Sequence, residues 1–87
     1  MDLLLVGLNH KTASVEVREK LYYTLDETKD VLPDLVQRFL KEGVLLSTCN
    51  RTELYGVLKD ELVKPEDIID YLIKRKDADG VVTRSHF

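Results

Sequence analysis

The spacing of the hydrophobic positions changes several times along the chain, and each change predicts a boundary between secondary-structure elements. Residues 3–6 are a continuous aliphatic run, Leu-Leu-Leu-Val, which is closed by Gly7, Asn9 and His10. A run without polar alternation is typical of a strand that is covered on both faces. We therefore expect a buried central strand at the start of the chain.

Further strands are predicted on either side of a short polar connection. Residues 44–47 (Val-Leu-Leu-Ser) are mostly aliphatic, and residues 52–58 alternate weakly between polar and apolar positions. The connection, Cys49-Asn50-Arg51, is too short for a crossover between parallel strands. The two strands are therefore expected to pair as an antiparallel hairpin with Cys49 in its connection.

Between the first and second strands, the sequence predicts a short helix and a long one. The short helix would be capped by Thr12 and run through Glu19, and the long one would be capped by Thr24 or Asp26. A side-chain oxygen at such a position can accept a hydrogen bond from an amide group that the helix leaves without a partner.

The long helix is predicted from a broad apolar stripe with helical period. Residues 41–43 (Lys-Glu-Gly) would end it. Pro33 lies inside the pattern and, because it has no amide proton, either kinks the helix or marks a late first turn. The stripe consists of Val31, Leu32, Leu35, Val36, Phe39 and Leu40.

The last part of the sequence predicts a further helix and a fourth strand. Residues 65–67 (Pro-Glu-Asp) suit a helix start, Asp79-Gly80 would end the helix, and residues 81–87 would form the strand. The order β-α-β-β-α-β predicts an α+β, ferredoxin-like split βαβ fold with an antiparallel sheet and two helical layers on one face. Because the sequence stops within an expected element, we expect a fragment of a longer protein.

Composition and charge exclude several classes of function. Eighty-seven residues with 33% charged and 44% hydrophobic side chains fit one small globular domain. Thirteen Lys and Arg against sixteen Asp and Glu give a net charge of −3, which argues against a sequence-indifferent nucleic-acid binder. The longest apolar runs are far shorter than the ~20 residues of a membrane span, and a single cysteine cannot form an internal disulfide. We therefore expect a cytoplasmic protein without membrane contact.

The chemistry of the chain is concentrated in residues 47–53, Ser-Thr-Cys-Asn-Arg-Thr-Glu. Cys49 is a candidate nucleophile, because the guanidinium of Arg51 would favour the thiolate; its alternative role is that of a small buried hydrophobic residue. Arg51 could bind a carboxylate through two parallel hydrogen bonds, or it could be a solvated charge or an ion-pair partner of Glu53. Thr48 and Asn50 could donate hydrogen bonds to an oxyanion, although turn chemistry explains Asn50 equally well.

The remaining candidate groups are weaker. His10 follows the first strand and could be a base, but a lone histidine in such a loop is more often structural. A metal site would need more His or Cys ligands than the chain has, and its scattered single glycines do not form a phosphate-binding loop.

A second motif, residues 7–19 (Gly-Leu-Asn-His-Lys-Thr-Ala-Ser-Val-Glu-Val-Arg-Glu), lies upstream of residues 47–53. Together, in this order and spacing, the two motifs resemble the glutamyl-tRNA reductase family, the first committed enzyme of tetrapyrrole synthesis from glutamate. That family usually has proline where this chain has Ser14, a difference that costs rigidity at a helix start but no chemistry. The resemblance covers the whole chain and identifies residues 1–87 as the N-terminal part of the catalytic, substrate-binding domain.

The resemblance implies a reaction in which a cysteine carries the substrate. Cys49 would attack the aminoacyl ester of glutamyl-tRNA to form a thioester, which NADPH would reduce to glutamate-1-semialdehyde, a precursor of 5-aminolevulinate and the porphyrins. Arg51 would hold a carboxylate of the glutamyl group, with Thr48 and Asn50 lining the same pocket. The family's catalytic histidine lies beyond residue 87, so neither His10 nor His86 takes that role.

The same resemblance implies parts that lie outside this chain. The NADPH-binding Rossmann domain is expected elsewhere, because the sequence contains no G-x-G-x-x-G, and the dimerisation domain is also expected outside residues 1–87. The implied partners are glutamyl-tRNA, a second subunit bound through the C-terminal region, and glutamate-1-semialdehyde aminomutase. The chain alone is not expected to carry out the reduction.

Two other classes of function are left as alternatives. The first is a stand-alone ferredoxin-like module that binds RNA or a regulatory ligand and has a structural cysteine. An RNA-binding sheet exposes aromatic and basic residues on its central strands, whereas here the first strand is aliphatic and the third offers only Tyr55. The second is a redox sensor, which is disfavoured because no second cysteine could resolve an oxidised Cys49.

Overall fold

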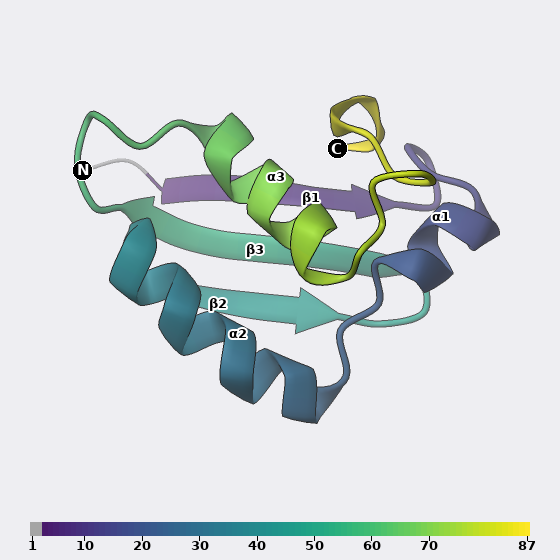
Figure 1. The fold of residues 1–87 in the computed structure, drawn as a ribbon, viewed down its shortest axis with the longest axis horizontal. Coiled ribbons are helices and arrows are strands. Elements are labelled where there is room, and N and C mark those ends of the chain that lie inside the picture. Colours follow the sequence, from purple (N-terminus) through teal and green to yellow (C-terminus); the bar gives the residue numbers. More distant parts are fainter. Residues whose placement is uncertain (1–2) are drawn as a thin grey trace.

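The fold is built on a three-stranded antiparallel sheet, against which the helices lie (Figure 1). The computed structural model describes residues 3–87. The strands β1 (Leu3–Asn9), β2 (Leu40–Ser47) and β3 (Arg51–Leu58) lie in the order β1-β3-β2. The prediction of an antiparallel hairpin is confirmed, because β2 pairs with β3 from Leu40 opposite Leu58 to Ser47 opposite Thr52.

Strand β1 lies at an edge of this sheet, so the prediction of a buried central strand is wrong for residues 3–87. Val6 and Leu8 are buried, whereas Leu3 and Leu5 on the opposite face are 73% and 54% exposed. The unbroken aliphatic run therefore results from aliphatic side chains on both faces of the strand, only one of which the described residues cover.

Helix α1 (Val15–Lys20) begins later than predicted, with Ser14 rather than Thr12 as its N-cap. The Ser14 hydroxyl accepts a hydrogen bond from the amide of Val17. Thr12 instead stabilises the turn after β1, where its hydroxyl accepts a hydrogen bond from the amide of Asn9 at 3.0 Å. The serine found in place of the expected proline therefore supplies the cap of the helix.

Helix α2 (Leu25–Arg38) begins at Thr24, which confirms one of the two predicted caps. The Thr24 hydroxyl accepts from the amide of Glu27 at 3.1 Å, and the Glu27 carboxylate accepts from the amide of Thr24 at 3.0 Å. Pro33 neither marks the start of the helix nor ends it. It lies on the exposed side, where water can replace the amide donor that proline lacks.

The end of α2 differs from the prediction, because the helix stops at Arg38 and β2 begins at Leu40. Residues 41–43 therefore belong to a strand and not to a helix end. Leu40 fits the helical spacing of the apolar stripe, but it is buried through its place in the sheet. Its side chain fills the space over Gly43, where a Cβ would lie 2.8 Å from Leu40 Cδ1.

Helix α3 (Pro65–Arg75) starts at the predicted proline but ends before the predicted Asp79-Gly80. Asp77 adopts a left-handed conformation with φ of 51°. The amide of Ala78 donates to the carbonyl of Ile73 at 3.0 Å, and that of Asp77 donates to Lys74 at 2.9 Å. This pair of bonds is the Schellman motif, which closes the helix and turns the chain back toward the core.

The prediction of a fourth strand over residues 81–87 is wrong for the described chain. The amide of Val82 donates a hydrogen bond to the carbonyl of Ala78. The amides of His86 and Phe87 donate to the carbonyls of Thr83 and Arg84, respectively. These amide groups therefore close turns instead of pairing with β1. Residues 84–86 form the short 3₁₀ helix η1 (Arg84–His86). The class α+β with an antiparallel sheet is confirmed, but the ferredoxin-like order β-α-β-β-α-β is not formed by these residues.

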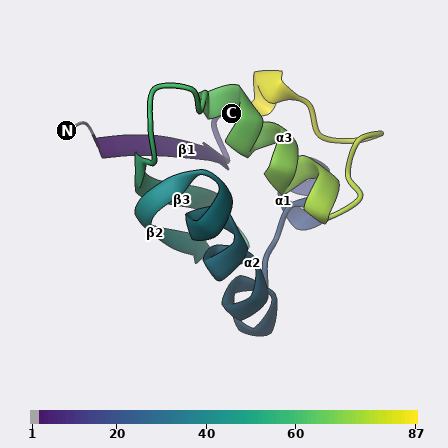
Figure 2. The ribbon, with the colours of Figure 1, turned by 60° about the vertical axis from the view of Figure 1, so that its left-hand side comes forward.

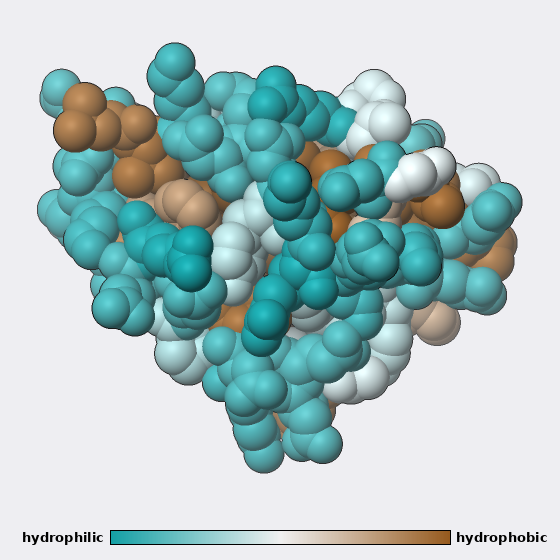
Figure 3. Space-filling view, viewed as in Figure 1, coloured by the Kyte–Doolittle hydropathy of each residue, from teal (hydrophilic) through white to brown (hydrophobic). Residues whose placement is uncertain are grey.

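Helices α2 and α3 lie side by side on one face of the sheet, as a single layer rather than the predicted two (Figures 1 and 2). Helix α2 packs against β2, and α3 packs against β1. The outer surface of this side is largely hydrophilic (Figure 3). The core between the helices and the sheet contains the fully buried Leu8, Leu21, Tyr23, Val31, Leu35, Leu40, Leu54, Ile68, Leu72 and Val82.

Candidate active site at the turn between β2 and β3

The polar segment predicted to carry the chemistry lies at the end of the sheet where β1 and β2 finish and β3 begins, beside α1 (Figure 1). The amide of Thr48 donates to the carbonyl of Arg51 at 2.7 Å and closes the turn around Cys49 and Asn50. Cys49 is exposed, so the alternative of a cysteine buried in the core is wrong for residues 3–87. Its thiol is accessible to a molecule in solution.

The hydroxyl of Thr48 shapes this turn. It accepts hydrogen bonds from the amides of Asn50 at 3.2 Å and Arg51 at 3.3 Å. Both bonds use the oxygen as acceptor, which leaves the hydroxyl proton for another partner. Turn formation and donation to a bound oxyanion are therefore compatible roles for this side chain.

Two further hydroxyls tie the turn to the segment that links α1 to α2. The Thr52 hydroxyl donates to the carbonyl of Leu21 at 3.0 Å and lies 2.8 Å from the hydroxyl oxygen of Ser47. The Ser47 oxygen accepts from the amide of Tyr23 at 2.9 Å. Because each hydroxyl has one proton, Ser47 must donate to Thr52 while Thr52 donates to Leu21. We call these three hydrogen bonds the hydroxyl bridge.

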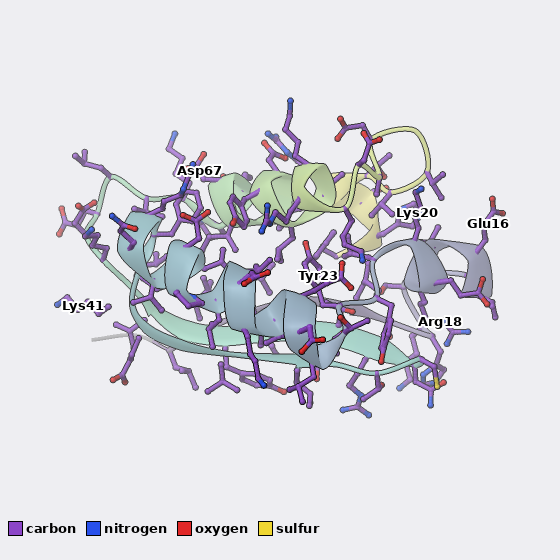
Figure 4. All side chains as sticks on the ribbon, turned by 60° about the horizontal axis from the view of Figure 1, so that its bottom comes forward. Glu16, Arg18, Lys20, Tyr23, Lys41 and Asp67 are labelled. Carbon is purple, nitrogen blue, oxygen red and sulfur yellow. The ribbon has the colours of Figure 1, made fainter. Side chains whose placement is uncertain are left out.

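Tyr23 anchors the same segment to the other side of the core. Its hydroxyl donates to the carbonyl of Leu72 in α3 at 2.6 Å, and the ammonium of Lys76 lies 5.3 Å from the centre of its ring. Burial raises the pKa of the Tyr23 phenol far above its usual value, so the hydroxyl keeps its proton and remains a donor. Figure 4 shows Tyr23 in the space enclosed by the helices and the sheet.

A cavity of about 490 Å³ opens beside Cys49 and is lined by Glu19, Tyr22, Ser47 and Thr48 as well. Glu19 comes from the last turn of α1, and Tyr22 follows the C-cap residue of that helix, Leu21. The sequence analysis missed both residues. Glu19 is the last residue of the second motif and Tyr22 lies just beyond that motif. Neither position in the sequence indicates contact with a turn so much later in the chain.

Arg51 is placed outside this cavity. Alternation along β3 buries Thr52 on the helix-covered face and directs Arg51 and Glu53 to the opposite face. There, Nη1 of Arg51 lies 3.5 Å from Oε1 of Glu53, which also accepts from the hydroxyl of Tyr55 at 3.2 Å. The ion pair that was one alternative for Arg51 is thus present, and the guanidinium side chain is still 52% exposed.

The structure therefore brings Cys49 and Thr48 to one cavity, while Asn50 and Arg51 are not among its lining residues. His10 is exposed after β1, and Nδ1 of His86 accepts a hydrogen bond from the amide of Thr83, the residue before η1. Within residues 3–87, no group of three or more His, Cys, Asp or Glu side chains is placed to hold a metal ion. None of the helices described is long and apolar enough to cross a membrane.

Comparison with known proteins gives consistent matches. A family sequence model described as "Glutamyl-tRNAGlu reductase, N-terminal domain" matches residues 6–87. Proteins named glutamyl-tRNA reductase from Chloroherpeton thalassium and Chlorobaculum parvum are 43% and 42% identical to the chain over 88 residues. These matches cover 100% of this chain but only 20% and 21% of the relatives, so the chain spans about a fifth of their length.

Replacement of Thr52 by valine tests the hydroxyl bridge. The Thr52→Val variant should lower the free energy of unfolding by about 1–3 kcal/mol, because Leu21 and Ser47 lose a hydrogen-bond partner in a buried position. Thr28→Val is the control, since the Thr28 hydroxyl bonds only to the carbonyl of Thr24 one turn earlier; a change below about 0.5 kcal/mol is expected. Chemical denaturation measures the free energy of unfolding of both variants. Equal stability of Thr52→Val and Thr28→Val would contradict a stabilising role for the hydroxyl bridge.

Proposed function

The chain belongs to the glutamyl-tRNA reductase family as its N-terminal domain, and from this membership we propose that Cys49 is the nucleophile that accepts the glutamyl group. The thiolate sulfur would bond to the ester carbonyl carbon of glutamyl-tRNA. The carbon–oxygen ester bond would break, and the tRNA would leave with its terminal hydroxyl restored. The product on the protein is a thioester, a better hydride acceptor than an oxygen ester.

The observation that carries this proposal is the exposed thiol of Cys49 in a turn that is fixed at both ends. The flanking residues Ser47 and Thr52 are held by the hydroxyl bridge, and a cavity opens beside the thiol. A nucleophile needs access to its substrate and a defined position relative to it. A cysteine kept only for packing would be buried, as free cysteines usually are.

We propose supporting roles for the residues next to Cys49. The free hydroxyl proton of Thr48 can be donated to the oxyanion that develops when sulfur adds to the carbonyl. Arg51 can exchange its single contact with Glu53 for a bidentate pair with a carboxylate of the glutamyl group. Asn50, at the exposed tip of the turn, would contribute a side-chain amide to the same substrate.

The reduction step is proposed to take place in the complete protein, with NADPH as the source of hydride. The support is that Gly7, Gly43 and Gly56 lie within strands and Gly80 lies in a turn after α3, so none occupies the strand-to-helix turn of a dinucleotide-binding fingerprint. We therefore place NADPH binding outside this N-terminal domain. The homodimer, the aminomutase partner and the cytoplasmic location remain predictions for the longer protein.

Replacement of Cys49 by serine in the full-length protein tests the proposed function directly. We expect glutamate-1-semialdehyde formation to fall below detection, because a hydroxyl lacks the nucleophilicity of a thiolate. NADPH oxidation in the presence of glutamyl-tRNA is the readout. The melting temperature should not change, since the side chain is exposed. Near-normal turnover by Cys49→Ser would show that the sulfur is not the nucleophile.

Replacement of Arg51 by lysine separates carboxylate binding from a surface charge. The rate on glutamyl-tRNA should fall roughly 30-fold to several thousand-fold, equivalent to about 2–5 kcal/mol, because an ammonium cannot form two parallel hydrogen bonds. Arg38→Lys is the matched control, since Arg38 contacts Asp34 and the Tyr71 ring at the end of α2 and does not line the cavity beside Cys49. A loss below about threefold for Arg51→Lys, with an unchanged melting temperature, would end the carboxylate hypothesis.

A further inference from the structure

We propose that the cavity beside Cys49 binds the terminal adenosine of the aminoacylated tRNA and that Tyr22 stacks on its base. This inference rests on the proposed function. It adds a subsite for the leaving group, and it assigns the two halves of the ester to opposite sides of the nucleophile. Glu19 and Tyr22, which the thioester chemistry itself does not use, become residues that bind substrate.

The chemistry of the attack limits where the nucleoside can lie. The sulfur of Cys49 must approach the ester carbon to about 3–3.5 Å, and that carbon is joined through one oxygen to the terminal ribose. The terminal nucleoside is therefore held close to the thiol at the moment of reaction. The cavity that Cys49 lines measures about 490 Å³, within the roughly 300–1,000 Å³ of small-molecule sites.

Charge favours the nucleoside over the glutamyl side-chain carboxylate as the group that enters this cavity. The lining side chains include the carboxylate of Glu19 and no cation. A glutamyl carboxylate placed there would face a like charge, whereas the exposed guanidinium of Arg51 lies on the helix-free side of β3. An adenine base is uncharged, and ribose hydroxyls can donate hydrogen bonds to Glu19. The terminal adenosine, whose base and ribose are uncharged, therefore fits the cavity better than the side-chain carboxylate of the glutamyl group.

The backbone holds Tyr22 in the position that stacking requires. Its neighbours Leu21 and Tyr23 are 0% and 2% exposed, whereas Tyr22 is 40% exposed. The carbonyl of Leu21 and the amide of Tyr23 are the two backbone groups fixed by the hydroxyl bridge. The Tyr22 ring is thus directed outward beside the turn. Exposed aromatic rings are the usual platform for unpaired bases, at about 1–3 kcal/mol per stacked base.

The decisive experiment compares two substrates that differ in the nucleoside. The full-length protein and its Tyr22→Ala and Tyr22→Phe variants are assayed with glutamyl-tRNA and with the α-thioester of glutamate and ethanethiol. The small thioester reaches Cys49 by thiol exchange and has no nucleoside to stack. Leu62→Ala, an exposed residue that does not line the cavity, is the control for an unrelated loss of surface apolar area.

We expect Tyr22→Ala to lower kcat/KM for glutamyl-tRNA by about 5- to 150-fold, the equivalent of ~1–3 kcal/mol. Its rate on the small thioester should stay within about threefold of the wild type. Tyr22→Phe, which keeps the ring, should retain most activity on both substrates. Adenosine 5′-monophosphate should also inhibit the reaction of the wild type with glutamyl-tRNA more strongly than that of Tyr22→Ala. This comparison does not depend on turnover of the small thioester.

Two outcomes would overturn the inference. Equal losses on both substrates would mean that the cavity holds the glutamyl group or that Tyr22 only shapes the turn. Unchanged kinetics together with unchanged inhibition by adenosine 5′-monophosphate would mean that no base stacks there. The proposed function is tested separately by the Cys49→Ser variant. If that variant is active, the assignment of Cys49 as nucleophile is wrong. If it is inactive while Tyr22→Ala has normal kinetics, only the proposed nucleoside subsite is refuted.

Discussion

The buried hydroxyl of Thr52 is the contact on which the candidate site depends. Thr52 is 1% exposed, and its hydroxyl joins the start of β3 to the carbonyl of Leu21 and to Ser47 at the end of β2. Without it, only the hydrogen bond from the Tyr23 amide to Ser47 would join the turn to the segment between α1 and α2. With it, Ser47 and Thr52 both hold the Leu21–Tyr23 segment, which the Tyr23 hydroxyl in turn joins to α3.

Neighbouring residues of β3 have different roles because their side chains lie on opposite faces of the sheet. Because side chains alternate between faces, Thr52 enters the core while Arg51 and Glu53 lie on the helix-free face. The residues that fix the turn are thereby separated from those that remain free to bind a charged ligand. In the proposed reaction, this separation places a carboxylate site on one side of Cys49 and the cavity with Tyr22 on the other.

Local patterns predicted those features that depend on residues close in sequence. The Thr24 cap, the proline at the start of α3 and the antiparallel hairpin around Cys49 each follow from a few adjacent residues. Leu40 and residues 81–87 were assigned wrongly, because Leu40 is buried by pairing with β3 and Val82 by its return to the core after the Schellman motif. Tyr22 and Glu19 could not be found, since the hydrogen bonds that bring them to Cys49 span 24 and 31 residues of sequence.

The central claim, that Cys49 accepts the glutamyl group, can be tested by trapping the thioester. The full-length protein is mixed with glutamyl-tRNA in the absence of NADPH, quenched with acid and digested for mass spectrometry. The account predicts one glutamyl group on the peptide that contains Cys49, removable by hydroxylamine and absent from Cys49→Ser. Formation of semialdehyde after addition of NADPH, without any such adduct at Cys49 before it, would contradict the account.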